Sequence, residues 1–399
     1  MSQMILTNRD IKTIYFCPKK ARYEIQNSNG PNLPQDIKTF STDAFGCLLV
    51  VIPDEIVSRS PYVLKIKKTG KKLSDYHFLE AAFIGYVLES CGQEVGSIIF
   101  ESEHYSTSVN WRPYVTRMLS LLSYFCTETD YKVSKTHLCR LCPFVEKCFH
   151  EARAIESIDF LHGLRGKTAE KLRKIGIDSI KDLLNQRDRL IEHFGPERTR
   201  KLIAHARSVI ENRPVLFAQP PQLENGIFLD IESYTPTDFD YLFGVLSDGT
   251  YIPFLARDQN EEVRAFRNVL EFIDQTSGPV YHFHQYEVQR FKKLAKRYGI
   301  DIPKEFFKRF VDVYKLYADH VALPVPSYSL KVLARYFGFQ WRNDINGRTV
   351  IDTYARYMST GDEDILNAIL VYNEDDVRAT ELLVSKLREM CSTKELEVL

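Results

Sequence analysis

The sequence lacks any uninterrupted apolar stretch of the roughly 18 residues that a membrane-spanning helix requires. Its first ten residues, MSQMILTNRD, also lack the apolar core of a secretory signal peptide. These absences predict a cytoplasmic protein with no membrane association. Because disulfides are rare in the cytoplasm, we expect the eight cysteines to be thiols or metal ligands.

A net charge is also missing, since 53 basic residues balance 53 acidic ones. The charges are nevertheless unevenly spread. Lys and Arg exceed Asp and Glu by two in residues 1–152 and by five in residues 153–216, whereas the acids exceed by seven in residues 217–399. A short basic segment beside an acidic one is typical of a nucleic-acid-binding region next to a metal-binding pocket. A chain of 399 residues is too long for one core, so we expect an α/β protein with these three segments as domains.

The pattern of apolar residues predicts strands at 47–53 and 62–67 and a helix at 75–90. The segment 212–226 is rich in proline and ends in glycine, which indicates a linker. After it, strand-like and helical patterns alternate, which favours an α/β domain with a mixed central sheet over residues 217–399.

The strand predicted in GIFLDIESY (226–234) carries two acids, Asp230 and Glu232. The period of two places both carboxylates on one side of the strand. Two buried acids repel each other and lose hydration unless a divalent cation neutralises them. An edge strand with solvated acids is the alternative interpretation.

Two later segments add acids in defined places. In residues 279–299 a short strand, VYHFH, leads into an amphipathic helix with Glu287 in its first turn, where a carboxylate also favours the helix dipole. The helix predicted at 371–387 places Tyr372 and Asp376 four residues apart and therefore on one face. Its other acids, Glu374 and Asp375, are expected to be solvated.

Asp-x-Glu, His-x-x-x-Tyr-Glu and Tyr-x-x-x-Asp, taken together, resemble the three exonuclease motifs of the DEDD family of ribonuclease H-like nucleases. The resemblance covers roughly residues 222–390, and residues 311–339 resemble the connecting segment of the RecB-associated subgroup. Glu287 stands where the family usually has Asp, and Tyr372 is typical of the tyrosine branch. The resemblance implies a 3′–5′ exonuclease with catalytic residues Asp230, Glu232, Glu287, Tyr372 and Asp376.

Four such carboxylates can hold two Mg²⁺ or Mn²⁺ ions, one lowering the pKa of an attacking water and the other stabilising the departing 3′-oxygen. Asp230 would bridge the ions and Tyr372 would position the water. Asp312, at the end of the predicted strand FVDVY, is a candidate contact to the metal ligands or to the substrate end. His282 and His284 are expected to pack in the strand or to contact phosphate rather than to bind metal.

Three cysteines, Cys139, Cys142 and Cys148, have the spacing of metal ligands, and a fourth thiolate is needed to complete the set. Cys17 is the best candidate because it also stands in a Cys-Pro step. One cysteine upstream and three downstream resemble the RecB-like nucleases that carry a 4Fe–4S cluster, with Zn²⁺ as the alternative occupant. The remaining thiols are expected to stand alone: Cys47, Cys91, Cys126 and Cys391.

A RecB-like site of the PD-(D/E)xK type needs an Asp followed by Glu-x-Lys on the next strand. Asp54 supplies the first residue and Lys67 the lysine, but Lys65 occupies the place of the Glu. A cation in a ligand position repels Mg²⁺. The sequence therefore predicts that residues 1–152 retain the fold with a degenerate site that binds or threads nucleic acid.

Residues 161–172, LHGLRGKTAEKL, resemble a helix–hairpin–helix, which implies a small all-α domain that binds nucleic acid. Its glycines permit a tight hairpin and let backbone N–H groups approach phosphate. Lysines on the following helix would add sequence-independent, salt-sensitive binding. A plain helical linker with solvated lysines is the alternative. The expected contacts are Gly163, Gly166, Lys167, Lys171 and Lys174.

These patterns predict metal-dependent 3′–5′ hydrolysis of single-stranded or 3′-ended nucleic acid, with DNA favoured over RNA, as in an enzyme of DNA repair. One alternative is a nucleic-acid-binding adaptor without catalysis. Another is a nuclease that cuts with the N-terminal RecB-like site.

Overall fold

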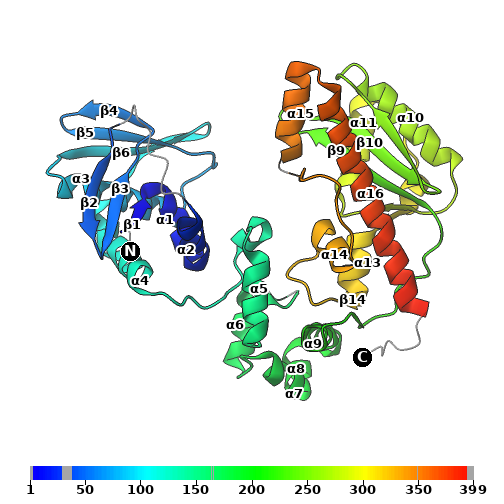
Figure 1. Cartoon of the computed structure of the whole chain (residues 1–399), viewed down its shortest axis with the longest axis horizontal. Coiled ribbons are helices and arrows are strands. Elements are labelled where there is room, and N and C mark those ends of the chain that lie inside the picture. Colours follow the sequence, from blue (N-terminus) through cyan, green and yellow to red (C-terminus); the bar gives the residue numbers. More distant parts are fainter. Residues whose placement is uncertain (1–2, 29–37, 163, 165, 348, 393–399) are drawn as a thin grey trace. The chain divides into compact units, whose positions relative to one another are not determined.

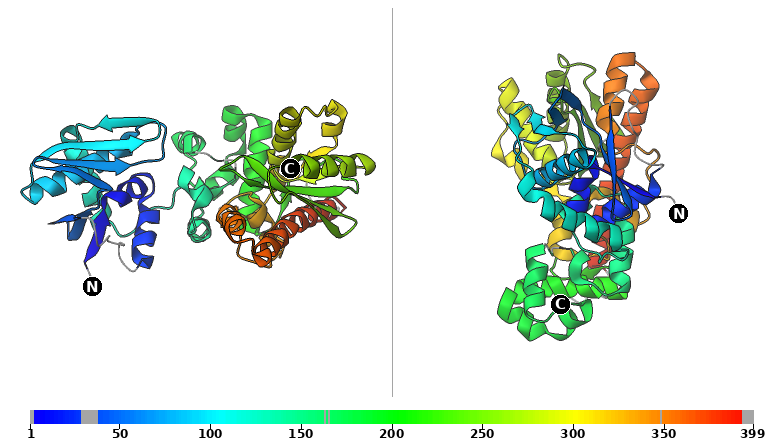
Figure 2. Two further views of the ribbon diagram at one scale, coloured as in Figure 1. Left: turned by 90° about the horizontal axis from the view of Figure 1, so that it is seen from above. Right: turned by 90° about the vertical axis from the view of Figure 1, so that its left-hand side faces the viewer.

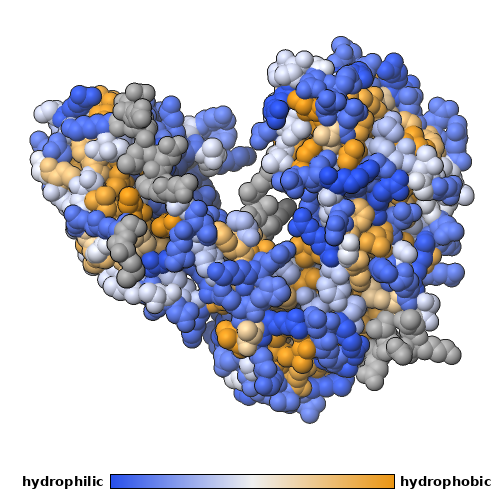
Figure 3. Space-filling model, viewed as in Figure 1, coloured by the Kyte–Doolittle hydropathy of each residue, from blue (hydrophilic) through white to orange (hydrophobic). Residues whose placement is uncertain are grey.

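The chain divides into two units, residues 1–152 and 153–399 (Figure 1). This computed structural model describes residues 3–28, 38–162, 164, 166–347 and 349–392. In that part of the chain, no helix combines the length and the apolar character needed to cross a bilayer. In the face shown by the space-filling view, hydrophilic residues predominate and hydrophobic residues form patches between them (Figure 3).

The first unit contains two sheets. One has the order β1-β3-β2, with β1 parallel to β3, and the other has the order β4-β5-β6-β7, with β5 parallel to β6. The predicted strands at 47–53 and 62–67 are confirmed as β3 and β5. The strands are β1 (Met4–Thr7), β2 (Phe40–Ala44), β3 (Cys47–Val51), β4 (Glu55–Arg59), β5 (Tyr62–Lys67), β6 (Val95–Ser102) and β7 (Tyr105–Ser108).

Helix α3 (Asp75–Ser90) connects the parallel strands β5 and β6, and it confirms the predicted helix at 75–90. It contacts strands of both sheets, so most of its surface is buried in the core of the unit. Because apolar residues surround this helix on nearly all sides, its sequence shows little amphipathic pattern. The other helices are α1 (Ile11–Phe16), α2 (Pro18–Asn27), α4 (Val115–Thr127) and α5 (Val145–Ala154), with short 3₁₀ turns η1 (Asn8–Asp10), η2 (Arg112–Tyr114) and η3 (His137–Leu141).

The second unit is built on a five-stranded mixed sheet of order β11-β10-β9-β12-β13. Strand β10 is antiparallel to β9 and β11, whereas β12 is parallel to β9 and β13. Numbered within the sheet, this order is 3-2-1-4-5, and it confirms the predicted mixed α/β sheet. The strands are β9 (Ile227–Tyr234), β10 (Phe239–Ser247), β11 (Thr250–Leu255), β12 (Val280–His282) and β13 (Phe310–Asp312).

Helices cover both faces of this sheet (Figure 2). Helices α10 and α11 pack on one face, and α16 crosses the other face against β9, β10 and β12. Helix α16 spans 30 residues, so it extends well beyond the predicted helix at 371–387. The helices are α10 (Glu262–Gln275), α11 (Tyr286–Tyr298), α12 (Lys304–Lys308), α13 (Val313–His320), α14 (Leu330–Tyr336), α15 (Thr349–Thr360) and α16 (Glu363–Ser392).

A helical segment precedes the sheet in the same unit. The predicted linker 212–226 contains a short strand, β8 (Val215–Leu216), which pairs with β14 (Val321–Ala322). The linker prediction is therefore wrong for these two residues, whose backbone groups join a ladder instead of remaining solvated. The preceding elements are η4 (Ile158–Phe160), α6 (Gly166–Lys174), α7 (Ile180–Asn185), α8 (Arg187–Phe194) and α9 (Pro196–Glu211).

Candidate metal centre and active site

The acids of strand β9 face helix α16. Alternation along the strand places Asp230 and Glu232 on the same side as Phe228. Phe228 belongs to the hydrophobic cluster that includes Val377 and Leu383 of α16. The sheet therefore presents both carboxylates to the helix that carries Tyr372 and Asp376.

Three carboxylates meet between β9 and α16. Oxygens of Asp230, Glu232 and Asp376 all lie within 4.8 Å of one another. Burial raises the pKa of Asp230 and of Glu232 well above the usual range, and the neighbouring acids raise both further. Burial also raises the pKa of Asp376, to about 6. Buried oxygens of like charge at this spacing suit a hard divalent cation, which would neutralise them.

Glu287 approaches this centre from the first turn of α11. Its side chain is buried, and its charge raises the pKa of Asp230 and of Glu232. In the described part of the chain, however, Glu287 does not belong to the group of carboxylates whose oxygens lie within 4.8 Å of one another. Its Oε2 atom is 3.2 Å from Nδ1 of His282, which is itself buried. Burial raises the pKa of Glu287, and His282 opposes that shift. His282 thus holds a candidate metal ligand, a role beyond the strand packing or phosphate contact that was predicted.

Asp376 is held by donors from its own helix and from a distant segment. Tyr372, one turn earlier on α16, shares a hydrogen bond with it, as their spacing predicts. The indole Nε1 of Trp341 donates to Oδ1 of Asp376 at 2.7 Å. Burial raises the pKa of Tyr372, so its phenol keeps its proton. Lys331 on α14 lies over the rings of Tyr372 and Trp341, 5.0 and 5.2 Å from their centroids.

Asp312 fixes the loop that leads into α11. It pairs with His282 in the register of β12 and β13, and its Oδ1 accepts the backbone N–H of His284 at 3.0 Å. The same oxygen caps α13 through the N–H of Lys315. Its charge also raises the pKa of Glu287. The predicted strands VYHFH and FVDVY are shorter in the structure, because β12 ends at His282 and β13 at Asp312, where these loop and cap contacts begin.

The prediction that Asp375 is solvated is wrong. Its side chain is buried and accepts the backbone N–H and the Nε of Arg342 at 2.8 and 2.7 Å. Glu374 is partly exposed and pairs with Arg342 and Arg378, which lower its pKa against the effect of burial. These ion pairs fasten the segment that carries Trp341 onto α16.

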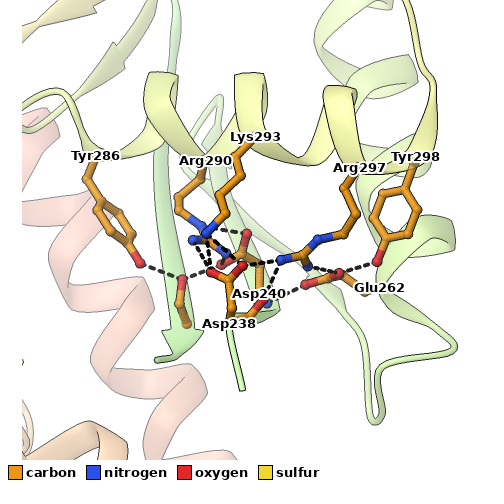
Figure 4. A network of polar contacts seen from close by, with 9 residues as sticks. Asp238, Asp240, Glu262, Tyr286, Arg290, Lys293, Arg297 and Tyr298 are labelled. Atoms are coloured by element: carbon orange, nitrogen blue, oxygen red, sulfur yellow. Dashed lines mark hydrogen bonds and ion pairs between the residues drawn. The ribbon is translucent and has the colours of Figure 1, made fainter. Parts of the chain in front are cut away.

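A polar network anchors α11 beside the carboxylates (Figure 4). Arg290 on α11 pairs with Asp240, which is fully buried on β10, and with Asp238 in the preceding turn. Tyr286, the first residue of α11, donates to Ser233 at 2.7 Å. Because Glu287 lies between Tyr286 and Arg290, these contacts fix where its carboxylate points. The remaining members are Glu262, Lys293, Arg297 and Tyr298.

The four predicted cluster ligands come together in the first unit. Cys17 lies between α1 and α2, Cys139 and Cys142 lie at η3, and Cys148 lies on α5. Burial raises the pKa of Cys17, and Cys139 and Cys142 are close enough to raise it further. Burial raises the pKa of Cys148 to about 11, with a contribution from Cys17. The arrangement joins the first helices of the unit to its last segment.

Backbone N–H groups point at several of these sulfurs. Thr136 donates its N–H to Cys139 Sγ at 3.3 Å. The backbone N–H groups of Lys20 and Phe144 lower the pKa of Cys17 and of Cys142 against the effect of burial. Such donors favour thiolates and therefore metal ligation.

Two cysteines that were expected to stand alone form a pair. The sulfur atoms of Cys47, at the start of β3, and Cys126, on α4, are 2.7 Å apart. The prediction of isolated thiols is therefore wrong for these two. Both are free cysteines in the structure. Both side chains lie in or against the same hydrophobic cluster of the unit, a contact that their separation in sequence does not reveal.

The predicted degenerate site is occupied by ion pairs. Lys65 lies 3.4 Å from both Glu55 and Glu101. Asp54 accepts the backbone N–H of Lys67 at 2.8 Å and pairs with Arg9. Lys67 itself is exposed at the end of β5.

Near Asp54, the sequence reasoning missed a buried acid, Glu80 on α3. Both of its oxygens accept from Lys68 at 2.8 Å, and Asn8 also donates to it. Burial raises the pKa of Glu80, and Asp54 contributes to this shift.

Helix α6 presents the predicted lysines to solvent. Lys167, Lys171 and Lys174 are exposed, whereas Ala169 and Leu172 on the same helix are buried. Gly166 begins this helix, and Gly163 lies outside the described residues. The helix is therefore amphipathic, with its basic side accessible.

Three further residues around the carboxylates were not predicted. Asn373 donates to Asp230 from α16, and Trp341 donates to Asp376. Lys331 lies near Asp376 and Glu232, whose charges oppose the lowering of its pKa by burial. The sequence could have indicated Asn373, because it adjoins Tyr372 on a helix whose buried polar side chains must find hydrogen-bond partners. No pattern in the sequence marks the other two.

Comparison with known proteins agrees with the geometry of the second unit. The family model RNase_H_2, of the RNase_H superfamily, matches residues 227–388. No curated protein and no solved structure matches the chain. The matched range contains the whole five-stranded sheet, the three clustered carboxylates and Glu287. The second unit therefore contains a ribonuclease H-like domain, which points to a nuclease-type hydrolase acting on nucleic acid.

Proposed function

We propose that the second unit is a metal-dependent 3′–5′ exonuclease whose ion ligands are Asp230, Glu232, Glu287 and Asp376. The observation that carries this proposal is the meeting of three carboxylates within 4.8 Å, two of them buried and Asp230 partly buried, with a fourth beside them. Burying such charges without a cation is unfavourable, because desolvation and mutual repulsion both oppose ionisation. The pKa values of these groups are raised for those two reasons.

Two divalent ions bound there would supply an activated water and stabilise the leaving 3′-oxygen. Asp230 is central among the acids, since Glu232, Asp376 and Glu287 all raise its pKa, and this supports a bridging role. Tyr372 keeps its proton at neutral pH and donates it to Asp376, so its hydroxyl oxygen can accept a hydrogen bond from the attacking water and orient it.

The proposed substrate is single-stranded or 3′-ended nucleic acid, with DNA favoured and RNA as the alternative. Support comes from the motif order, which resembles exonucleases of the DEDD family, and from the exposed lysines of α6. Lys167, Lys171 and Lys174 would bind phosphates without reading sequence, so binding should weaken steeply with added salt.

We propose that Cys17, Cys139, Cys142 and Cys148 hold a 4Fe–4S cluster. A zinc ion bound through Zn–S bonds of about 2.3 Å would bring its sulfurs to about 3.8 Å from one another. Among the described residues, no three of these sulfurs lie within 4.8 Å of one another. Each cysteine of a 4Fe–4S cluster binds a different iron, so the sulfurs stand farther apart. Iron and sulfide analysis, with absorption near 400 nm, tests this assignment, and stoichiometric zinc without iron would contradict it.

The experiment for the nuclease is incubation of 5′-labelled single strands with Mn²⁺ or Mg²⁺, comparing the wild type with Asp230→Ala. Stepwise shortening from the 3′ end that disappears in Asp230→Ala is the expected result. Retained binding without any shortening by the wild type would instead identify a nucleic-acid-binding adaptor.

A second candidate is cleavage by the first unit, and one observation favours it. The buried Glu80 of α3 lies near Asp54 and accepts a hydrogen bond from Lys68. Two acids and a lysine therefore lie close together, although Lys65 occupies the position where the RecB-like pattern has a Glu. Cleavage that survives Asp230→Ala but is lost in Asp54→Ala and in Glu80→Gln would establish this site.

A further inference from the structure

Asn373 lies at the centre of the contacts between β9, β10 and α16. Its side chain is completely buried, and its Nδ2 donates to Oδ2 of Asp230 at 2.7 Å. The same amide lowers the pKa of Glu232 as a hydrogen-bond donor. An amide nitrogen carries two protons, so one side chain can serve both carboxylates. Asn373 thus donates to Asp230 and lies close enough to lower the pKa of Glu232, the other acid of the Asp-x-Glu motif.

The orientation of this amide is chemically fixed. Its Oδ1 accepts the hydroxyl of Tyr251, on β11, at 2.8 Å. Turning the amide over would place an oxygen against the Asp230 carboxylate and a second donor against the Tyr251 hydroxyl. The first contact is repulsive, and therefore the nitrogen must face the acids.

Strand β10 leaves room for the amide. Gly244 stands directly opposite Asp230 in the register of β9 and β10. A Cβ atom at this position would lie 1.6 Å from Oδ1 of Asn373 and 2.8 Å from its Cγ. No side chain at position 244 is compatible with the observed place of Asn373, so the sheet is built around this contact.

We propose that Asn373 is a positioning residue that holds Asp230 and Glu232 in the orientation that receives divalent cations, with Tyr251 and Gly244 fixing the amide. This inference rests on the proposed metal-dependent function. The amide bonds Oδ2 of Asp230, whose Oδ1 takes no part in this contact. It is neutral and cannot lose a proton, so it offers a donor in every state of the centre, whether or not cations are bound.

Substitutions separate this role from simple packing. Asn373→Leu keeps the branched shape and the number of side-chain heavy atoms and removes the donor. Tyr251→Phe keeps the amide and removes only the group that orients it. Tyr317→Phe is the matched control. The buried hydroxyl of Tyr317 also donates to α16, because it lies 2.8 Å from the carbonyl oxygen of Leu383. Tyr317 belongs to a hydrophobic cluster that contains none of the carboxylates.

The test is calorimetric titration of the full-length protein with Mn²⁺, without nucleic acid, together with thermal unfolding in EDTA. Loss of a hydrogen bond that a neighbouring residue donates to a metal ligand lowers metal affinity about 10- to 100-fold, and we expect this for Asn373→Leu. Tyr251→Phe should weaken binding less, and Tyr317→Phe should bind as the wild type does. In the nuclease assay, Asn373→Leu should need more Mn²⁺ for half-maximal rate while saturating Mn²⁺ restores most of that rate.

Wild-type Mn²⁺ affinity in an Asn373→Leu protein that unfolds normally in EDTA would overturn this inference alone. Mn²⁺ binding that depends on Asn373 in a protein that never cuts would leave the inference standing and overturn the proposed nuclease. A wild type that binds no Mn²⁺ would overturn both. If Asn373→Leu does not fold, Tyr251→Phe decides, since an affinity equal to that of Tyr317→Phe contradicts the proposal.

Discussion

The indole nitrogen of Trp341 lies 2.7 Å from Oδ1 of Asp376, although 35 residues separate them in the sequence. Trp341 follows α14, and its neighbour Arg342 is tied to α16 through Asp375. The two contacts together close the segment after α14 over the carboxylates. Asp376 therefore depends on a part of the chain outside the sheet and outside its own helix.

Replacing Trp341 by Phe should weaken the centre without unfolding the domain. The ring packing is largely kept, but Asp376 loses its donor, so its carboxylate is less well oriented for a cation. We expect the Mn²⁺ concentration for half-maximal hydrolysis to rise about tenfold or more. Phe339→Leu is the control, because it alters packing 4.7 Å from the indole ring and leaves the N–H in place. Equal effects of the two variants would argue against the hydrogen bond.

Glu287 should be required for hydrolysis although it stands apart from the other three acids. Glu287→Gln keeps the shape and removes the charge, and we expect kcat to fall at least 100-fold because one ion loses a ligand. His282→Phe leaves the carboxylate but removes its partner 3.2 Å away, and a smaller loss, about tenfold, is expected. Single-turnover rates on end-labelled strands measure both, and near wild-type rates for Glu287→Gln would exclude it as a ligand.

The metal-free protein should become less stable as the pH rises through about 6. Burial raises the pKa of Asp376 from 3.8 to about 6, so the folded state favours the protonated acid. This stabilisation is complete below pH 3.8 and is lost as the pH rises through about 6, a difference of about 3 kcal/mol.

The pH effect can be measured by thermal unfolding in EDTA between pH 5 and 7.5. The wild type should lose stability relative to Asp376→Asn as the pH rises. Mn²⁺ at pH 7.5 should recover the difference in the wild type, since a ligand that binds only the folded state stabilises it. Curves that stay parallel across this range would show that Asp376 does not carry the effect.

The sequence was sufficient to predict the elements that carry local patterns. The acids of β9 stand out in an apolar strand, and the four-residue spacing of Tyr372 and Asp376 predicts their shared face. Asn373 and Trp341 act across 143 and 35 residues of chain, and only the packing of α16 and of the segment after α14 creates those contacts. Asp375 was misjudged for the same reason, because Arg342, which covers it, comes from that segment.

Arg290 should stabilise the second unit strongly, because it neutralises an acid that water cannot reach. Asp240 is fully buried, and Arg290→Met would leave its charge without a partner, at a cost of about 3–5 kcal/mol. Adding Asp240→Asn to this variant should recover part of the loss, since no buried charge then remains. Urea unfolding in a Trp111→Phe background reports on this unit, because Trp341 is then the only tryptophan. A loss in Arg290→Met that Asp240→Asn leaves unchanged would mean that packing of the arginine stem, and not its charge, holds α11 and Glu287 in place.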